Sequence, residues 1–453
     1  MTVSPPTRGD NLLDYADQGL FLALRATGQE SVAQMVWIYE HPIDLDRLRH
    51  FHANLAHGLL GRRIERSPLP FGRHRWVSAA GVTGRLDLVE TPRPRRELSD
   101  WADERTRISA DPEVGPGWHL GVARFDDGST AVSLVASHCL VDGMGLIQTV
   151  VNAITDQPRD LALPDPASRP TLRGAFMDLR ESLRGLGPAA RAFALMAKLA
   201  VRDRPRGGRR ARDSGTSAHV AVEEVQAPSV VAFVDLEAWD AKAEELSGNS
   251  HSLVAGFAAK LAERMGRIRV EDGTVKLIIP VNERAADDTR ANAVVLGYAN
   301  LDPVPVTSTL ADARVVIREA LQAVRQEPNE SFQTLPLIPF IPKRAVVGGA
   351  DVMFGFAAEL PVSASNLGDI DPTVTRADGT EADYFYIRGV DGRVTRDVLE
   401  RRRGFLTVIC ARVAGRVVLP IIAYKPGVDN SKNALREDVA LTLSEFGLAA
   451  VIE

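Results

Sequence analysis

The hydrophobic positions of this chain alternate between the two-residue period of a strand and the three-to-four-residue period of a helix. The clearest case spans 130–154, where Val132, Leu134 and Ala136 fall on one face of a strand and apolar residues then recur at helical spacing over 144–154. The same order of elements recurs in both halves of the chain, which predicts an α/β protein. Strands are expected at 32–39, 118–125, 130–137, 230–235, 275–281, 293–299, 383–388, 405–411 and 416–423, and helices after Asp44, from 144, at 251–262 and from about 431.

The middle of the chain breaks this alternation. Prolines punctuate 158–170, and 172–201 is helical in character but interrupted at Gly187-Pro188. A Pro/Gly-rich run with five arginines follows at 204–212, a composition typical of solvated, disordered chain. We therefore predict three parts: an N-terminal lobe at 1–170, a helical and Arg-rich connector at 171–225, and a C-terminal lobe at 226–453.

Composition narrows the classes of function. The chain has 453 residues, 45% hydrophobic and 25% charged, which suits a globular protein with two cores. Its formal net charge of −5 argues against nucleic acid as a partner. With only two cysteines, no signal peptide and no apolar run long enough to span a membrane, a reducing cytoplasm is the default expectation.

Candidate chemistry is concentrated at the end of the strand at 130–137. His138 leaves this buried strand, Asp142 falls in the turn, and Gly143 and Gly145 let the chain swing into the next helix. An imidazole in a water-poor site can act as a general base near neutral pH. This arrangement favours an enzyme, although a single histidine at a strand end is more often a hydrogen-bonded core residue.

Other chemistries find little support in the sequence. Cys139 follows His138 directly, and neighbouring strand residues point to opposite faces, so the two cannot readily share a proton. There is no Gly-x-Ser-x-Gly elbow, phosphate loop, His-Glu-x-x-His or Cys-x-x-Cys motif. The remaining histidines form no metal-ligand pattern, so we expect an enzyme with no metal and no cofactor.

The motif His138-x-x-x-Asp142-Gly143, between a strand and a helix, resembles the signature of the chloramphenicol acetyltransferase-like superfamily of thioester-dependent acyltransferases. The fuller family signature begins with two histidines, and here Ser137 replaces the first. Five further segments resemble family segments in the family's order. They are the amphipathic helix within 43–57, Pro116–Leu120, Ile279–Arg284, Ala291–Gly297 and Ser365–Gly368. The resemblance is nearest to the bacterial wax ester synthase/diacylglycerol acyltransferase and polyketide-associated acyltransferase branches.

The resemblance implies two chloramphenicol acetyltransferase-like lobes arranged as a V with a central tunnel. His138 would be the general base that moves an acyl group from acyl-CoA, or an acyl carrier protein, to an alcohol. Asp142 would pair with a distant arginine, for which Arg284 is our candidate, and with Gly143 would support the catalytic loop. Ser365, Asn366 and Ser137 are candidate contacts to the substrate or the oxyanion. A monomer is expected.

Two alternatives remain open at this stage. The loss of the first motif histidine gives weight to a non-catalytic, condensation-like module that binds carrier proteins or acyl chains. An amide-forming condensation enzyme would use the same base with an amine acceptor. Separately, apolar helices beside a basic run predict a peripheral membrane contact through 171–212, against the simpler reading of a flexible linker.

Overall fold

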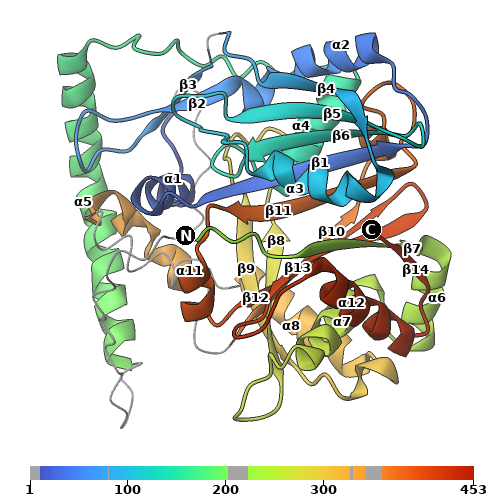
Figure 1. Cartoon of the computed structure of the whole chain (residues 1–453). Coiled ribbons are helices and arrows are strands. Elements are labelled where there is room, and N and C mark those ends of the chain that lie inside the picture. Colours follow the sequence, from blue (N-terminus) through green and yellow to red (C-terminus); the bar gives the residue numbers. More distant parts are fainter. Residues whose placement is uncertain (1–10, 80, 203–222, 327–329, 343–359) are drawn as a thin grey trace.

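The computed structural model describes residues 11–79, 81–202, 223–326, 330–342 and 360–453. Two sheets, each backed by helices, form two lobes that meet along their edges, with one long helix at the side of both (Figure 1). The expected two-lobed α/β architecture is confirmed, and the site candidates fall where the lobes meet.

The first lobe is built on a five-stranded sheet in the order β11-β1-β6-β5-β4. Strand β6 pairs antiparallel with β1 on one side and with β5 on the other, so the strand that precedes His138 lies in the centre of the sheet. The elements of this lobe are α1 (Tyr15–Thr27), β1 (Glu30–Tyr39), α2 (Leu45–Leu55), β2 (Arg62–Glu65), β3 (Arg75–Ser78), β4 (Arg85–Arg93), α3 (Leu98–Thr106), β5 (Trp118–Phe125), β6 (Thr130–Ser137) and α4 (Gly143–Ile154).

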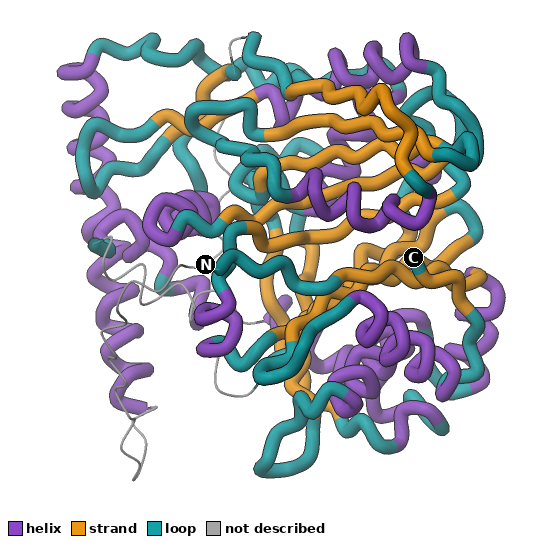
Figure 2. The backbone as a smooth tube through the Cα atoms, in the orientation of Figure 1, coloured by secondary structure: helices purple, strands orange, loops and turns teal. Residues whose placement is uncertain are grey.

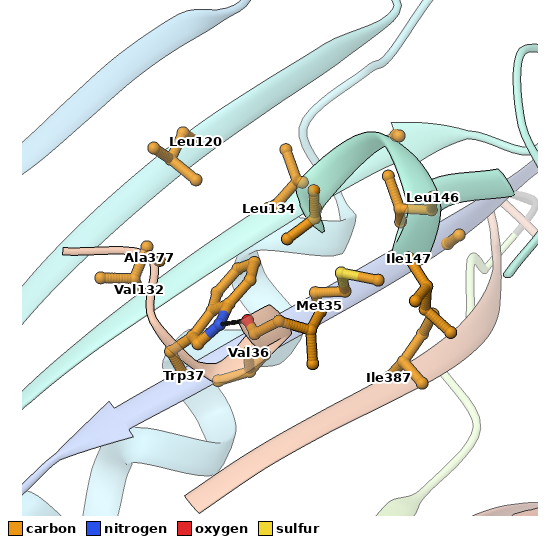
Figure 3. Packing of buried hydrophobic residues seen from close by; sticks show 14 of the residues in the cluster. Met35, Val36, Trp37, Leu120, Val132, Leu134, Leu146, Ile147, Ala377 and Ile387 are labelled. Carbon is orange, nitrogen blue, oxygen red and sulfur yellow. Dashed lines mark hydrogen bonds between the residues drawn. The ribbon is translucent and has the colours of Figure 1, made fainter. Parts of the chain in front are cut away.

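The core of this lobe fixes the central strands against one another. Trp37 of β1 is fully buried, and its indole N–H donates a hydrogen bond to the carbonyl of Val374 (2.7 Å; Figure 3). Val132 and Leu134 of β6 lie in the same cluster as Leu146 of α4. Because burying each such side chain contributes about 1.5–3 kcal/mol, the end of β6 and the start of α4 are held in place by packing on both sides.

The second lobe contains a seven-stranded sheet in the order β14-β7-β13-β12-β10-β8-β9. Figure 2 shows helices gathered on the outer side of this sheet, away from the first lobe. Asn249 caps α7 with a reciprocal capping box, as its position before the helical pattern predicts. The elements are β7 (Ser229–Asp235), α6 (Leu236–Glu245), α7 (Ser250–Arg264), β8 (Val275–Asn282), β9 (Val294–Leu301), α8 (Ala311–Gln326), α9 (Glu330–Gln333), β10 (Val362–Asp369), α11 (Arg396–Arg401), β12 (Phe405–Val413), β13 (Arg416–Tyr424), α12 (Lys432–Glu445) and β14 (Ala450–Ile452).

One strand crosses between the lobes. Strand β11 (Tyr384–Gly392) comes late in the chain, yet it pairs antiparallel with β1 over its whole length and forms the edge of the first sheet. A boundary at 226 therefore does not separate the two sheets. Hydrophobic periodicity predicts that 383–388 is a strand, but it carries no signal for which sheet the strand joins.

The connector begins with α5 (Thr171–Arg202), which is continuous through Pro188 where the sequence predicts an interruption. One face of α5 is anchored to the first lobe, because the buried carboxylate of Asp178 pairs with Arg75 and accepts from the Ser67 hydroxyl (2.5 Å). The arginines at 204–212 lie outside the described residues.

The described ranges contain no helix that combines the length and the apolar character needed to cross a bilayer.

Candidate active site

His138 lies immediately after β6, at the edge of the first lobe that faces the second. Its backbone N–H donates to the carbonyl of Ser31 (2.9 Å), which ties the residue to β1. Its side chain is partly buried, in contrast to the fully buried residues that precede it in β6. The packed strand thus places an imidazole at the lobe junction with one side accessible.

The ring of His138 is oriented by a residue of the second lobe. Nδ1 lies 2.8 Å from Oδ1 of Asn292, in the loop between β8 and β9. The Asn292 side-chain NH₂ donates to the carbonyl of His138 (3.1 Å) and to Oδ1 of Asp17 (3.1 Å), so the Oδ1 atom of Asn292 faces the ring. An amide oxygen only accepts, hence Nδ1 carries the proton and Nε2 keeps its lone pair.

Asp17 of α1 completes this relay. Its carboxylate also accepts from the backbone N–H groups of Ala291 and Asn292, each at 2.9 Å. Asp17 is fully buried, and burial, reinforced by the nearby charge of Asp14, raises its pKa to about 6. A buried carboxylate of the first lobe therefore holds the second-lobe loop that orients His138.

Asp142 is the N-cap of α4 and a contact point between the lobes. Its carboxylate accepts from the N–H of Gly145 (2.7 Å), from the N–H of Ala293 (2.8 Å) and from Nη2 of Arg284 (2.8 Å). The side chains of Asp142 and Arg284 are only 2% and 4% exposed. The ion pair predicted from the sequence is present, and together with the two backbone hydrogen bonds it ties the turn before α4 to the loop between β8 and β9.

Arg284 is itself fixed by several acceptors. Besides Asp142, it donates to the carbonyls of Ala291 (2.9 Å) and Arg290 (3.1 Å), so it braces the loop that carries Asn292. A Cβ at Gly145 would lie 3.0 Å from the Arg284 guanidinium carbon, which explains why glycine stands at the start of α4. Gly143 has more room, with Leu367 and Ile387 the nearest neighbours of such a Cβ at 3.8 Å.

A second buried arginine supports the same turn from the other side. Arg62 of β2 donates to the carbonyls of Leu140 (2.8 Å) and Thr289 (2.5 Å), and its guanidinium stacks on Trp76. Burial lowers the pKa of Arg62 to about 9, which leaves it charged at neutral pH. Arg62 thus bridges the turn between β6 and α4 in one lobe and the 284–293 loop of the other.

A cavity of about 180 Å³ lies beside His138 between the two lobes. Its walls come from the first sheet, through Ser31 and 389–391, and from the second lobe, through Phe405, Thr407 and Ile422. Val390 and Asp391 also line a neighbouring cavity of about 330 Å³ that includes Glu30 and Arg107. Two neighbouring cavities therefore lie near the lobe junction, and the smaller of them adjoins His138.

Ser137 and Cys139, which flank His138, face their own loop. The Ser137 hydroxyl accepts from the backbone N–H of Cys139 (3.4 Å), and neither residue lines the cavity beside His138. Burial raises the pKa of Cys139 to about 12, so no thiolate forms there near neutral pH. The geometry gives no support to Ser137 as a substrate contact or to Cys139 as a nucleophile.

The segment Ser365–Gly368 belongs to β10 rather than to a simple turn. Its pairing with β12 is irregular between Asn366 and Asp369, and Gly368 has a φ of 71°. Asn366 accepts from the N–H of Gly368 (2.8 Å), while its buried side-chain NH₂ has no hydrogen-bond partner in the described structure. Leu367 comes within reach of Gly143, so this segment does lie at the lobe junction.

Within the described ranges, no three His, Cys, Asp or Glu side chains gather as they would around a metal ion.

Sequence reasoning missed three residues of this site: Asp17, Arg62 and Asn292. Asn292 lies within a segment that carries the family resemblance, and this was the available signal. The sequence predicts a strand from 293 onward, however, and contains no pattern that predicts a contact between Asn292 and His138. Asp17 and Arg62 stand in ordinary amphipathic segments, and only the tertiary fold brings them to the turn.

No protein-family model matches the chain, and no curated protein matches it. Solved structures do. The first condensation domain of the CDA synthetase has a TM-score of 0.56 and 15% identity, over 98% of this chain and 100% of that one. A wax ester synthase/diacylglycerol acyltransferase from Marinobacter aquaeolei VT8 has a TM-score of 0.56 and 16% identity, over 96% and 98%. The condensation domain of the Monacolin K polyketide synthase MokA has a TM-score of 0.54 and 12% identity, over 96% of both chains.

These similarities extend over nearly the whole length of each chain. At sequence identities this low, they establish a shared fold. The chain has the two-lobed condensation fold of the chloramphenicol acetyltransferase-like proteins, as the resemblance of its motifs implies. The proteins that share the fold include condensation domains and an acyltransferase.

Proposed function

We propose that this protein is a thioester-dependent acyltransferase that moves an acyl group from acyl-CoA or an acyl carrier protein to an alcohol, with His138 as the general base. One observation carries the proposal. The hydrogen bond from Nδ1 of His138 to Asn292 Oδ1 leaves the Nε2 lone pair free, beside a cavity between the lobes. A base needs that tautomer and that access.

The reaction follows from these groups. Nε2 of His138 takes the hydroxyl proton of the acceptor while its oxygen attacks the thioester carbonyl carbon. The tetrahedral intermediate then collapses, the C–S bond breaks, and Nε2 returns the proton to the departing thiolate. Because the thioester arrives activated, the step requires no metal, prosthetic group or covalent enzyme intermediate.

The developing oxyanion needs hydrogen-bond donors. The unpartnered side-chain NH₂ of Asn366 on β10 is our candidate. Ser365 precedes it in the same strand, so its hydroxyl points to the opposite face. A buried donor without an acceptor is costly in a resting protein, and an oxyanion would satisfy it. Asp142, Gly143 and Arg284 act as positioning residues for the turn.

The acceptor class separates this proposal from its alternatives. The full-length protein would be incubated with acyl-CoA and a panel of alcohols and amines, and free thiol would be followed. Thiol release that depends on an alcohol supports an ester-forming enzyme. Release that depends only on amines identifies an amide-forming enzyme. If no acceptor increases thiol release, with short and long acyl groups carried by either CoA or a carrier protein, the protein is a binding module.

The connector helix supports a peripheral contact with an anionic membrane surface. Along α5, exposed apolar side chains recur at intervals of three and four, and five basic residues form one stripe beside them. The helix is anchored through its opposite face and stands at the edge of the molecule (Figure 1). The apolar residues are Leu172, Phe176, Leu179, Leu183, Leu186 and Phe193, and the basic ones are Arg173, Arg180, Arg184, Arg191 and Lys198.

A further inference from the structure

A second cavity, of about 370 Å³, lies in the second lobe between the start of α7 and the length of α8. This volume falls within the range of about 300–1,000 Å³ that small-molecule sites occupy. Three of its six polar lining residues are arginines, and no acidic residue lines it among the described residues. The lining residues are Asn249, His251, Arg314, Ile317, Arg318, Leu321, Gln322 and Arg325.

The three arginines share one face of α8, since they are spaced by four and seven residues. All three are exposed, and no carboxylate of the described chain forms an ion pair with them. Ile317 and Leu321 form an apolar floor between them. Three unneutralised guanidinium groups over an apolar floor suit a ligand that carries several phosphates and a flat ring.

The N-terminus of α7 also favours a ligand that carries phosphates. His251 lies in the first turn of the helix, where unpaired backbone N–H groups give a partial positive charge. His251 is exposed, and partial desolvation of its ring together with the charge of Arg412 lowers its pKa. The imidazole is therefore neutral near pH 7 and can donate a hydrogen bond, while the arginines supply the charge.

Two strands run from the neighbourhood of this cavity toward the lobe junction. A Cβ at Gly297 of β9 would lie 3.3 Å from Val324 of α8, so the Arg325 end of α8 packs near the start of β9. That strand begins two residues after Asn292, which orients His138. On the other side, Asp369 lies near His251, since its negative charge raises the pKa of that imidazole. Asp369 is also the last residue of β10, the strand that contains Asn366.

We propose that this cavity binds the 3′-phosphate and pyrophosphate of coenzyme A, and that CoA rather than a carrier protein is the acyl donor. The inference rests on the proposed acyl transfer and names its donor. CoA carries a pyrophosphate and a 3′-phosphate, whereas a carrier-bound pantetheine arm carries a single phosphodiester. Three arginines in a cavity large enough for a nucleotide match the first set of charges.

Binding measurements on the full chain test the site. We expect wild-type protein to bind CoA more tightly than dephospho-CoA, with an affinity that falls as salt rises. Because the triple variant R314Q/R318Q/R325Q lacks all three charge-assisted hydrogen-bond donors, it is expected to raise the Kd for CoA about tenfold or more and to lose the preference over dephospho-CoA. The control R124Q removes an exposed arginine from the first lobe and is expected to bind as wild type.

Equal affinity of the wild type for CoA and dephospho-CoA, or unchanged CoA binding by the folded triple variant, overturns the proposal. A third outcome also overturns the proposal: the triple variant keeps its CoA binding but no longer transfers the acyl group from an acyl carrier protein. That result would assign the cavity to a carrier protein.

Acyl-pantetheine, which has no phosphate, separates this site from the proposed function. Wild-type transfer from acyl-pantetheine with no measurable CoA binding refutes the site and leaves the acyltransferase standing. Phosphate-dependent CoA binding with no transfer from any donor supports the site and refutes the function. Slower transfer from acyl-CoA alone in the triple variant supports both.

Discussion

At the scale of single residues, the central feature is a chain of hydrogen bonds that crosses the lobe junction and orients His138. Asp17 holds Asn292, and Asn292 holds the Nδ1–H of His138. The relay leaves Nε2 as the only ring nitrogen with a free lone pair. In the proposed mechanism, the orientation of the His138 ring depends on two residues that do not line the cavity beside it.

Removing the amide of Asn292 is expected to lower kcat without removing the base. In Asn292→Ala the ring of His138 loses its orienting acceptor, and loss of such a supporting group typically costs about 10–100-fold. Steady-state kinetics check this, with Asn300→Ala, an exposed asparagine of β9, as the matched control. A variant with wild-type kcat would show that the tautomer is fixed by something else.

Asp17 is expected to give the protein a specific pH dependence of stability. Its native pKa of about 6 lies above the ordinary value of about 3.9, so the native state binds the extra proton. Its contribution is fully present below about pH 4 and is lost as pH rises through 6. A difference of about two pKa units corresponds to about 3 kcal/mol.

The measurement is the free energy of unfolding of wild type and Asp17→Asn from pH 4 to 7. We expect the wild type to lose about 3 kcal/mol relative to the variant across that interval, because the asparagine does not titrate. Parallel curves would show that Asp17 titrates as an ordinary carboxyl.

The sequence predicts part of this site. His138, Asp142 and Arg284 belong to a recognisable motif or to the end of a predicted strand, and the predicted ion pair exists. Asn292 contacts His138 although 154 residues separate them in the sequence. Asp17 contacts Asn292 across a separation of 275 residues. Such contacts arise from how the lobes pack, which local hydrophobic patterns do not encode.

At the scale of elements, the turn between β6 and α4 is clamped to the loop between β8 and β9. Asp142 caps α4 and at the same time accepts from Arg284 and the backbone of Ala293. One carboxylate thereby fixes both the direction of a helix and the distance between two lobes.

Breaking this clamp is expected to be costly. In Asp142→Asn or Arg284→Ala, a buried charge loses its partner, which typically costs about 3–5 kcal/mol. The exposed pair of Arg376 and Glu381 is the control, and Arg376→Ala is expected to cost under about 1 kcal/mol. Chemical denaturation measures all three, and a loss at the clamp no larger than at the control would contradict the account.

The connector helix gives a second prediction at this scale. Changing Arg173, Arg180, Arg184, Arg191 and Lys198 to glutamine is expected to weaken co-sedimentation with anionic vesicles but to spare transfer to a soluble acceptor. The charge-matched control changes five exposed basic residues elsewhere, Arg49, Arg124, Arg376, Arg401 and Lys425. No wild-type binding to vesicles at low salt would refute the membrane contact.

Some elements depart from the sequence pattern for physical reasons. Helix α5 continues through Pro188 because packing on one face, including the buried pair of Asp178 and Arg75, outweighs the bond that proline removes. The segment Ser365–Gly368 resembles a turn because of Asn366 and Gly368, but parallel pairing with β12 extends β10 through it. In both cases tertiary contacts override local preference.

At the scale of the whole molecule, the two lobes are interlocked rather than merely adjacent. Strand β11 leaves the second lobe to complete the first sheet, and α1 of the first lobe binds the second-lobe loop through Asp17. The cavity beside His138 takes its walls from both lobes. The proposed base His138 therefore lies where both lobes can contact a substrate.

The most direct measurement follows free thiol released from acyl-CoA, with and without an alcohol acceptor, by wild type and by His138→Ala. A positioned general base contributes about 10²–10⁴-fold, so the variant is expected to lose acceptor-dependent release by that factor. Its circular dichroism and free energy of unfolding are expected to stay close to those of the wild type. Acceptor-dependent release at the wild-type rate in folded His138→Ala would contradict the central claim.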